Sequence, residues 1–297
     1  MKILIIKLGA LGDVVRTTVL LNELDGEIHW LTSQLARPLL NSQKIKRIYS
    51  FENEKEKDEL KDIEFDLVLS LDEEEEPLRF LNNLKVKKLI GHFFNEKNQV
   101  DYTPECNYWL DMSFISKRFS RQEADKLKFL NQKTIPQILI ELINKEWTGQ
   151  EYDLGIKPKS LEECNGKIGL IDITESKWSN KYWAGYSKLK QKLEEGRYKV
   201  FFLGLKSSIQ EHIEDINNCE VIVCGDTLGM HIALALKKKV VALFNCTPPN
   251  EIYGYGRITK IVSPLLERYF MSRENTPEIQ SSIPIEEVYS KIKTILG

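Results

Sequence analysis

The most informative segment of this chain is Cys219-Glu-Val-Ile-Val-Cys-Gly-Asp-Thr-Leu-Gly-Met-His-Ile-Ala-Leu-Ala-Leu-Lys-Lys-Lys-Val-Val-Ala-Leu-Phe244. Two short runs rich in Val and Ile, 220–224 and 240–244, flank residues 228–236, whose apolar side chains cover every side of a helix. This pattern predicts a strand, a tight turn, a buried helix and a second strand, as in a parallel βαβ unit. The three lysines 237–239 suit the negative end of that helix.

The turn inside this unit has the residues of an anion site. Asp226 and Thr227 fall where an N-cap belongs, and the amides beside them would point out of the carboxyl edge of the sheet, where open α/β folds bind ligands. A phosphate would fit there. An ordinary capped core helix has the same spacing, so the pattern alone leaves both interpretations open.

The composition is that of a globular protein with room for two domains of ordinary size. A net charge of -2 offers no basic surface for nucleic acid, and the acidic run 72–76 before Pro77 is predicted to be a solvated loop. Five cysteines without a CxxC pair indicate reduced thiols in a cytoplasmic protein, with neither a disulfide framework nor a zinc site. Apolar runs are too short for a spanning helix, and residues 2–7 are predicted to be a strand rather than a signal peptide.

The N-terminal half starts with a strand at 3–6, followed by a glycine-bearing turn at 7–13 and a helix at 14–24. Gly9 and Gly12 allow tight backbone geometry, but their spacing is not G-x-G-x-x-G. The next strand, 27–31, ends without the acidic residue that a dinucleotide ribose needs, which disfavours a nicotinamide dehydrogenase. Asp13 falls in the first turn of its helix, either as a routine N-terminal acid or as a base held ready at the mouth of a cleft.

The remaining elements follow at α/β spacing. We expect a linker near 149–161, and the aromatic-rich section 92–147 either lines an acceptor groove or packs as core. Further helices are predicted at 35–40, 78–84, 135–145, 183–193, 208–216 and from Pro284 onward, and further strands at 47–51, 65–71, 86–90, 167–173 and 198–203. Thr174 and Lys177 follow the strand 167–173 at the same sheet edge as Asp226, where Lys177 is either a phosphate ligand or a solvated lysine.

With both turns in view, the sequence resembles glycosyltransferase family 9, the ADP-heptose:lipopolysaccharide heptosyltransferase family. Residues 2–16 resemble the opening of that family, and 225–236 with 240–248 and 253–256 resemble its donor motif. Residues 177–183 resemble the Lys-Trp-Pro segment, with Ser179 in place of the usual proline. The resemblance spans nearly the whole chain.

The family implies an α/β fold of the GT-B type, with two Rossmann-like doubly wound domains facing a central cleft. Residues 1–150 would bind the acceptor and residues 151–297 the nucleotide sugar, with the last helix packing back on the body. It also implies inverting transfer without a metal or a cofactor, from a donor such as an ADP-sugar. Carried over by position, Asp13 would be the general base beside the acceptor-side turn of Gly9 and Gly12. The donor would be bound by Thr174, Lys177, Asp226, Thr227, Leu228, Gly229 and His231. For Asp226 we expect capping of the turn amides or positioning of a sugar rather than direct phosphate contact, and His231 has an equal reading as a structural histidine.

Two departures from the family bear on specificity. The interval 203–220 has room for only one short helix, where relatives carry an extra strand and helix that shape the nucleoside pocket. The cysteine cluster that many relatives carry near the C-terminus is absent from 263–270, so no metal role is inherited.

The resulting hypothesis is a cytoplasmic glycosyltransferase that moves a sugar, with ADP-heptose as the donor the family suggests, to a hydroxyl of a cell-envelope glycan or glycolipid such as lipopolysaccharide core. The resemblance also implies peripheral contact with the inner membrane, although no amphipathic anchor stands out in the sequence. A non-catalytic nucleotide-sugar-binding or scaffold protein is the alternative. Retention of Asp13, Lys177 and the Asp226 turn favours the enzyme over it, and a sugar-nucleotide epimerase would need more acids or histidines than the sequence offers.

Overall fold

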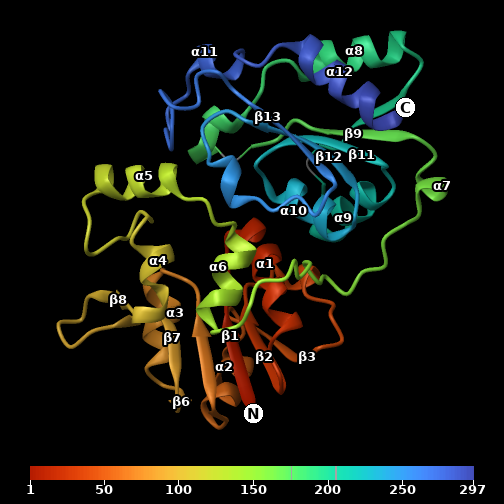
Figure 1. The fold of residues 1–297 in the computed structure, drawn as a ribbon. Coiled ribbons are helices and arrows are strands. Elements are labelled where there is room, and N and C mark those ends of the chain that lie inside the picture. Colours follow the sequence, from red (N-terminus) through yellow and green to blue (C-terminus); the bar gives the residue numbers. More distant parts are fainter. Residues whose placement is uncertain (175, 205) are drawn as a thin grey trace. The chain divides into compact units, whose positions relative to one another are not determined.

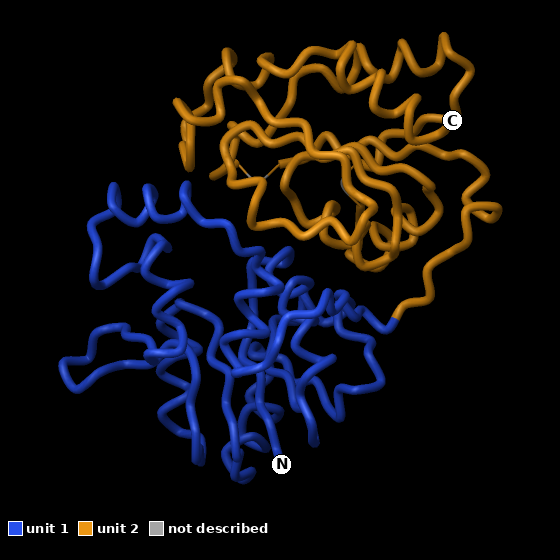
Figure 2. The backbone as a smooth tube through the Cα atoms, in the orientation of Figure 1, with its two compact units in different colours: residues 1–155 blue, residues 156–297 orange. Residues whose placement is uncertain are grey.

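The computed structural model describes residues 1–174, 176–204 and 206–297. The chain forms two compact units, residues 1–155 and 156–297 (Figures 1 and 2). The division after Gly155 falls inside the segment 149–161 where a linker is predicted, a little beyond the predicted boundary at residue 150. Within the described parts of the chain, none of the helices combines the length and apolar character of a membrane-spanning helix.

Unit 1 contains a sheet in the strand order β3-β2-β1-β5-β7-β8, parallel except for the antiparallel pairing of β7 with β8. Its strands are β1 (Lys2–Ile6), β2 (Glu27–Thr32), β3 (Ile45–Ser50), β5 (Leu67–Ser70), β7 (Leu89–Phe94) and β8 (Val100–Tyr102), with a separate pair β4 (Glu64–Phe65) and β6 (Lys85–Val86). Residues 3–6 of β1 are all buried. Their unbroken apolar run is typical of a parallel strand covered on both faces.

Helices surround this sheet, with α1 packed against α6, α2 against β3 and α3 against β7. They are α1 (Leu11–Thr17), α2 (Glu54–Lys61), α3 (Glu75–Leu81), α4 (Asn107–Leu110), α5 (Arg121–Leu130) and α6 (Ile135–Leu142), with 3-10 turns η1 (Thr18–Asn22), η2 (Arg37–Leu39) and η3 (Pro104–Cys106). The prediction of one helix over 14–24 is wrong, because α1 gives way to η1. The hydroxyls of Thr17 and Thr18 donate to the carbonyls of Asp13 and Val15 at 2.7 and 2.6 Å, and such bonds compete with a regular helix.

The predicted solvated acidic loop at 72–76 is exposed at residues 73–76, but its first residue is not solvated and its last two belong to a helix. Asp72 is buried, and its carboxylate accepts hydrogen bonds from Lys7 Nζ at 2.7 Å and from the amide of Leu8. Glu75 starts α3, and Pro77 falls in its first turn, where a missing amide hydrogen costs nothing. A buried lysine at the end of β1 needs a counterion, and the neighbouring strand β5 delivers Asp72 to it.

Unit 2 contains a fully parallel sheet in the order β10-β9-β11-β12-β13. Its strands are β9 (Lys167–Ile171), β10 (Lys199–Phe202), β11 (Val221–Gly225), β12 (Lys239–Phe244) and β13 (Ile258–Val262). Its helices are α7 (Leu161–Cys164), α8 (Tyr186–Glu195), α9 (Ile209–Asn217), α10 (Leu228–Ala235), α11 (Pro277–Gln280) and α12 (Ile285–Leu296), with the 3-10 turns η4 (Ser176–Lys181) and η5 (Pro249–Glu251). Figure 1 shows α8 and α12 on one face of the sheet and α9 and α10 on the other. Residues 229–235 of α10 are buried, which confirms the predicted buried helix between two parallel strands.

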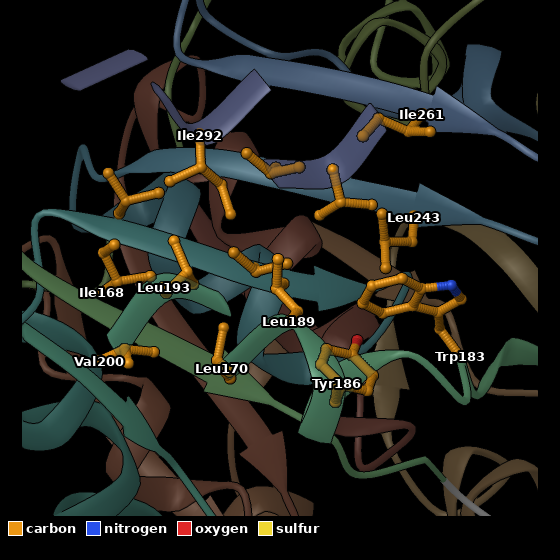
Figure 3. Packing of buried hydrophobic residues seen from close by; sticks show 14 of the residues in the cluster. Ile168, Leu170, Trp183, Tyr186, Leu189, Leu193, Val200, Leu243, Ile261 and Ile292 are labelled. Carbon is orange, nitrogen blue, oxygen red and sulfur yellow. The ribbon is translucent and has the colours of Figure 1, made fainter. Parts of the chain in front are cut away.

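The core of unit 2 lies between the sheet and the pair α8 and α12 (Figure 3). Ile292 of α12 and Leu189 of α8 pack there with Trp183, whose Nε1 donates to the carbonyl of Ile283 at 2.9 Å. Trp183 therefore belongs to the turn before α8, although a helix start is predicted there. A side chain at Gly185 would lie 2.2 Å from the Trp183 ring, so the glycine makes room for the indole.

The sequence predicts that the lysines 237–239 lie at the negative end of α10. The structure contradicts this prediction for Lys238. Lys237 adopts a left-handed conformation (φ 58°), which turns the chain, and Lys238 is buried. Its Nζ donates to the carbonyls of Asn217 at 2.8 Å and Lys159 at 3.2 Å. The lysine thus ties α9 to the segment before α7.

Candidate functional site

The turn between β11 and α10 carries the predicted donor residues. Thr227 is the N-cap of α10, but its side chain makes no capping hydrogen bond. Within the described parts of the chain, Thr227 Oγ1 is buried and has no hydrogen-bond partner. Burying a hydroxyl without a hydrogen-bond partner costs free energy. Binding of a group that hydrogen-bonds to Thr227 Oγ1 would therefore be favoured here.

Lys181 provides the positive charge at this turn. Its Nζ lies 3.0 Å from the backbone carbonyl oxygen of Asp226 and 3.4 Å from Asp226 Oδ2. His231 Nε2 lies 3.7 Å from the other carboxylate oxygen, Oδ1. The Asp226 carboxylate is therefore faced by a cation, which offsets the repulsion that a bare carboxylate would exert on a phosphate.

Lys177 and Thr174 lie in the segment that leads to Lys181. The side chain of Lys177 is exposed, and Thr174 Oγ1 donates to the carbonyl of Trp178 at 3.3 Å. Turn η4 is kinked at Trp178 (φ -128°, ψ 41°), and the Lys181 ammonium lies 5.0 Å from the centre of the Trp178 ring. Lys181 was not predicted from the sequence as a donor residue. It lies four residues after Lys177, and this spacing places two side chains together only on a regular helix.

Leu228 is the first residue of α10, and Gly229 and His231 are buried within the helix. A Cβ at Gly229 would lie 2.3 Å from Cδ1 of Ile171, the last residue of β9. The glycine therefore permits the close approach of α10 to β9. This approach brings the N-terminus of α10 to the carboxyl end of a neighbouring strand, where phosphate groups bind in open α/β sheets.

The corresponding turn of unit 1 joins β1 to α1. Asp13 lies in the first turn of α1, and its carboxylate is paired with Arg16. Gly12 lies within α1, and Gly9 precedes the helix with a φ outside the left-handed region. Among residues 1–174, 176–204 and 206–297, no atom would lie within 4 Å of a Cβ at Gly9, so this part of the turn is open.

Acidic groups gather around this turn. The Lys7–Asp72 ion pair fixes residues 7 and 8 to the end of β5, and Glu73 follows directly. Burial raises the pKa of the Glu73 carboxyl, and the carboxylates of Asp72 and Asp13 raise it further, while Lys7 lowers it. The Lys7–Asp72 pair could not be predicted from the sequence, because an acidic run normally indicates a solvated segment.

His92 and Ser70 add buried polar groups at the same edge of the sheet. His92 Nδ1 lies 3.3 Å from the carbonyl oxygen of Ser70. Burial lowers the pKa of His92 to about 4, so its imidazole is neutral at pH 7. Among the described residues, His92 Nε2 and Ser70 Oγ have no hydrogen-bond partner.

The described residues contain no group of three or more His, Cys, Asp or Glu side chains that could hold a metal ion.

Comparisons with known proteins bear on the whole chain. Residues 205–278 match the model of glycosyltransferase family 9 (heptosyltransferase). Lipopolysaccharide heptosyltransferase 1 of Campylobacter coli is 23% identical, over 88% of this chain and 89% of the relative. Among solved structures, E. coli heptosyltransferase WaaC with ADP has a TM-score of 0.68 at 13% identity, covering 99% of each chain. E. coli ADP-heptose lps heptosyltransferase II has a TM-score of 0.64 at 15% identity, covering 100% of each chain.

The two parallel α/β sheets have the GT-B architecture of these heptosyltransferases, which confirms the predicted fold. The family match falls on the segment that contains α9, α10 and the Asp226 turn, where the donor motif is expected. By these comparisons the chain is similar to glycosyltransferase family 9 (heptosyltransferase) over residues 205–278, and along its whole length it has the fold of the heptosyltransferases.

Proposed function

We propose that this enzyme transfers a heptose from ADP-heptose to a hydroxyl of a cell-envelope glycan or glycolipid such as lipopolysaccharide core. Unit 2 binds the nucleotide sugar, and unit 1 binds the acceptor. The observation that carries this proposal is the turn at the N-terminus of α10, where Lys181 approaches Asp226 and the buried Thr227 hydroxyl has no hydrogen-bond partner among the described residues. The similar proteins include lipopolysaccharide heptosyltransferase 1 and a heptosyltransferase solved with ADP, which supports ADP and heptose as the donor components.

The reaction is an inverting displacement. The acceptor hydroxyl attacks the anomeric carbon, the bond from that carbon to the diphosphate oxygen breaks, and the hydroxyl proton passes to the Asp13 carboxylate. The ADP leaving group carries the negative charge that develops. Lys181, the positive N-terminus of α10 and Lys177 stabilise this charge, so the transfer needs no metal ion. The enzyme acts in the cytoplasm, at the inner face of the membrane that holds a lipid-linked acceptor.

The direct test is release of ADP from ADP-heptose with heptose-deficient lipopolysaccharide as acceptor. Asp13→Ala is expected to lower turnover by about 10²- to 10⁴-fold, because the general base is lost, while ADP binding stays unchanged. Asp25→Ala removes an exposed acid of the same unit and is the matched control. Full turnover by Asp13→Ala would remove Asp13 from its role, and ADP binding without any turnover by the wild type would favour the non-catalytic alternative.

A further inference from the structure

His212 of α9 lies against the first turn of α10. The two helices pack together on one face of the unit 2 sheet (Figure 1). A Cβ at Gly229, the second residue of α10, would lie 3.4 Å from His212 Nε2. Because an amide nitrogen is only two covalent bonds from its own Cβ, His212 Nε2 is within about 6 Å of the Gly229 amide. That amide is one of the four at the start of a helix that lack a partner within the helix.

The imidazole of His212 is in a state suited to binding a polar ligand. The side chain is partly exposed, and neither ring nitrogen hydrogen-bonds to any other group that the structure describes. Burial is the main cause that lowers the pKa of His212; Asp215 opposes it and Lys206 adds to it. The ring is therefore mainly neutral at pH 7, with one nitrogen that donates and one that accepts.

His212 and Lys181 lie on opposite sides of the turn before α10. The side chain of Ile171, at the end of β9, meets the same glycine as His212, which places the imidazole on the β9 side. Lys181 lies on the β12 side, because the carbonyl of the next residue, Tyr182, accepts a hydrogen bond of 2.8 Å from Asn245, which directly follows β12. In the sheet, β9 and β12 flank β11 on opposite sides. A diphosphate at the turn would therefore have different side chains near its two ends.

We propose that His212 binds a ribose hydroxyl of the nucleoside diphosphate donor. The ribose is joined to its phosphate through a single CH2 group, so its hydroxyls come within reach of a side chain this close to the phosphate-binding amides. A hydroxyl both donates and accepts, which matches a neutral imidazole better than a second phosphate would, since phosphate oxygens mainly accept. The transferred sugar is then directed toward Lys181 and Asp226. This inference rests on the proposed function, because it assigns the nucleoside end of the same donor.

The experiment is calorimetric titration of the full chain with ADP, 2′-deoxy-ADP, 3′-deoxy-ADP and inorganic diphosphate. We expect the wild type to bind ADP about three- to tenfold more tightly than the analogue that lacks the contacted hydroxyl, the effect of one hydrogen bond. His212→Asn, whose short side chain does not reach the position of Nε2, should lose the same factor for ADP and nothing for that analogue or for diphosphate. His212→Gln does reach this position and should bind ADP nearly as the wild type does.

The Asn and Gln variants differ by one methylene group, so each controls for the folding of the other, and thermal unfolding should give them similar midpoints. Glu214→Gln changes an exposed residue of the same helix and should bind all four ligands as the wild type does. The proposal is overturned if both deoxy analogues bind the wild type as tightly as ADP, or if His212→Asn keeps full ADP affinity. Equal weakening of ADP and diphosphate by His212→Asn would also overturn it, since that result assigns the histidine to the shape of the turn.

These outcomes are distinguishable from a failure of the proposed function. If the wild type binds no nucleoside diphosphate, both the donor site and the role of His212 are wrong. If the wild type turns over ADP-heptose and His212→Asn binds ADP unchanged, only the role of His212 is wrong. If the ADP affinities follow the expected pattern but no acceptor receives heptose, the ribose contact holds and the proposed reaction fails.

Discussion

His92 is a buried histidine kept neutral by its surroundings. The groups near it are the Ser70 carbonyl, the Tyr102 ring and two cations, Lys7 and Lys117. Burial is the main cause of its lowered pKa, and the two lysines add to it. Protonation would place a third positive charge in this buried region, so acid should loosen unit 1 here.

This histidine makes stability depend on pH. Its pKa is about 4 in the folded chain, below the ordinary 6.5, so between these values the unfolded chain takes up a proton and the folded chain does not. The free energy of unfolding should therefore fall as the pH drops from 6.5 to 4, by up to about 3 kcal/mol from this group. Urea unfolding of wild type and His92→Asn over this range measures it. Equal pH slopes for the two proteins would contradict the assignment.

Single residues also mark where sequence reasoning reached its limit. Asp226 and Thr227 could be placed at a helix start because the flanking strand and the apolar helix are unmistakable. Lys181 could not be preferred over Lys177, since the kink at Trp178 breaks the regular spacing between them. The burial of Asp72 could not be predicted from its place in an acidic run, because only the fold brings Lys7 into contact with it.

At the scale of elements, the Lys7–Asp72 pair connects the turn before α1 to the end of β5. Both side chains are buried, so Asp72→Asn leaves the Lys7 ammonium without its counterion. We expect the free energy of unfolding to fall by about 3–5 kcal/mol. Adding Lys7→Met should recover part of that loss, because the double variant no longer holds a buried unpaired charge. Chemical unfolding of the single and double variants tests this, and a double variant as unstable as Asp72→Asn would rule out the pairing.

Two glycines at the carboxyl edge of the unit 1 sheet differ in what a methyl group would meet. Gly91 has φ 122°, and a Cβ there would lie 2.0 Å from the Ser70 carbonyl oxygen, which is backbone and cannot move aside. At Gly9 such a Cβ would have none of the described atoms within 4 Å. Gly91→Ala should therefore destabilise the protein by about 1–3 kcal/mol or more, while Gly9→Ala stays near the wild type. Thermal unfolding compares them, and similar losses in both variants would refute this.

The elements show why some boundaries were predictable. Helix α10 follows from an apolar run that no surface helix would carry, and α12 from its amphipathic repeat. The end of α1 does not follow from such patterns, because the hydroxyls of Thr17 and Thr18 redirect the backbone into η1. Helix α5 follows from its capping box, but that its leucines stay exposed could be learned only from the packing of unit 1.

At the scale of the whole molecule, two parallel α/β units agree with the resemblance drawn from two short motifs at opposite ends of the chain. Both motifs flank the carboxyl edge of a parallel sheet, where ligands bind in such folds. They do not identify the acceptor. Between β10 and β11 the described residues form one helix, α9, in agreement with the short interval that the sequence leaves there.

The central claim is that unit 2 binds a nucleoside diphosphate at the Asp226 turn, and calorimetric titration with ADP in the presence of EDTA tests it most directly. We expect the wild type to bind and Lys181→Ala to bind about tenfold more weakly or worse, because the Asp226 carboxylate then faces the phosphate without its cation. Lys177→Ala should weaken binding less, since its exposed charge is screened, and Lys188→Ala should have no effect. If neither ADP nor other nucleoside diphosphates bind, or if Lys181→Ala binds as tightly as the wild type, the donor site has been placed wrongly.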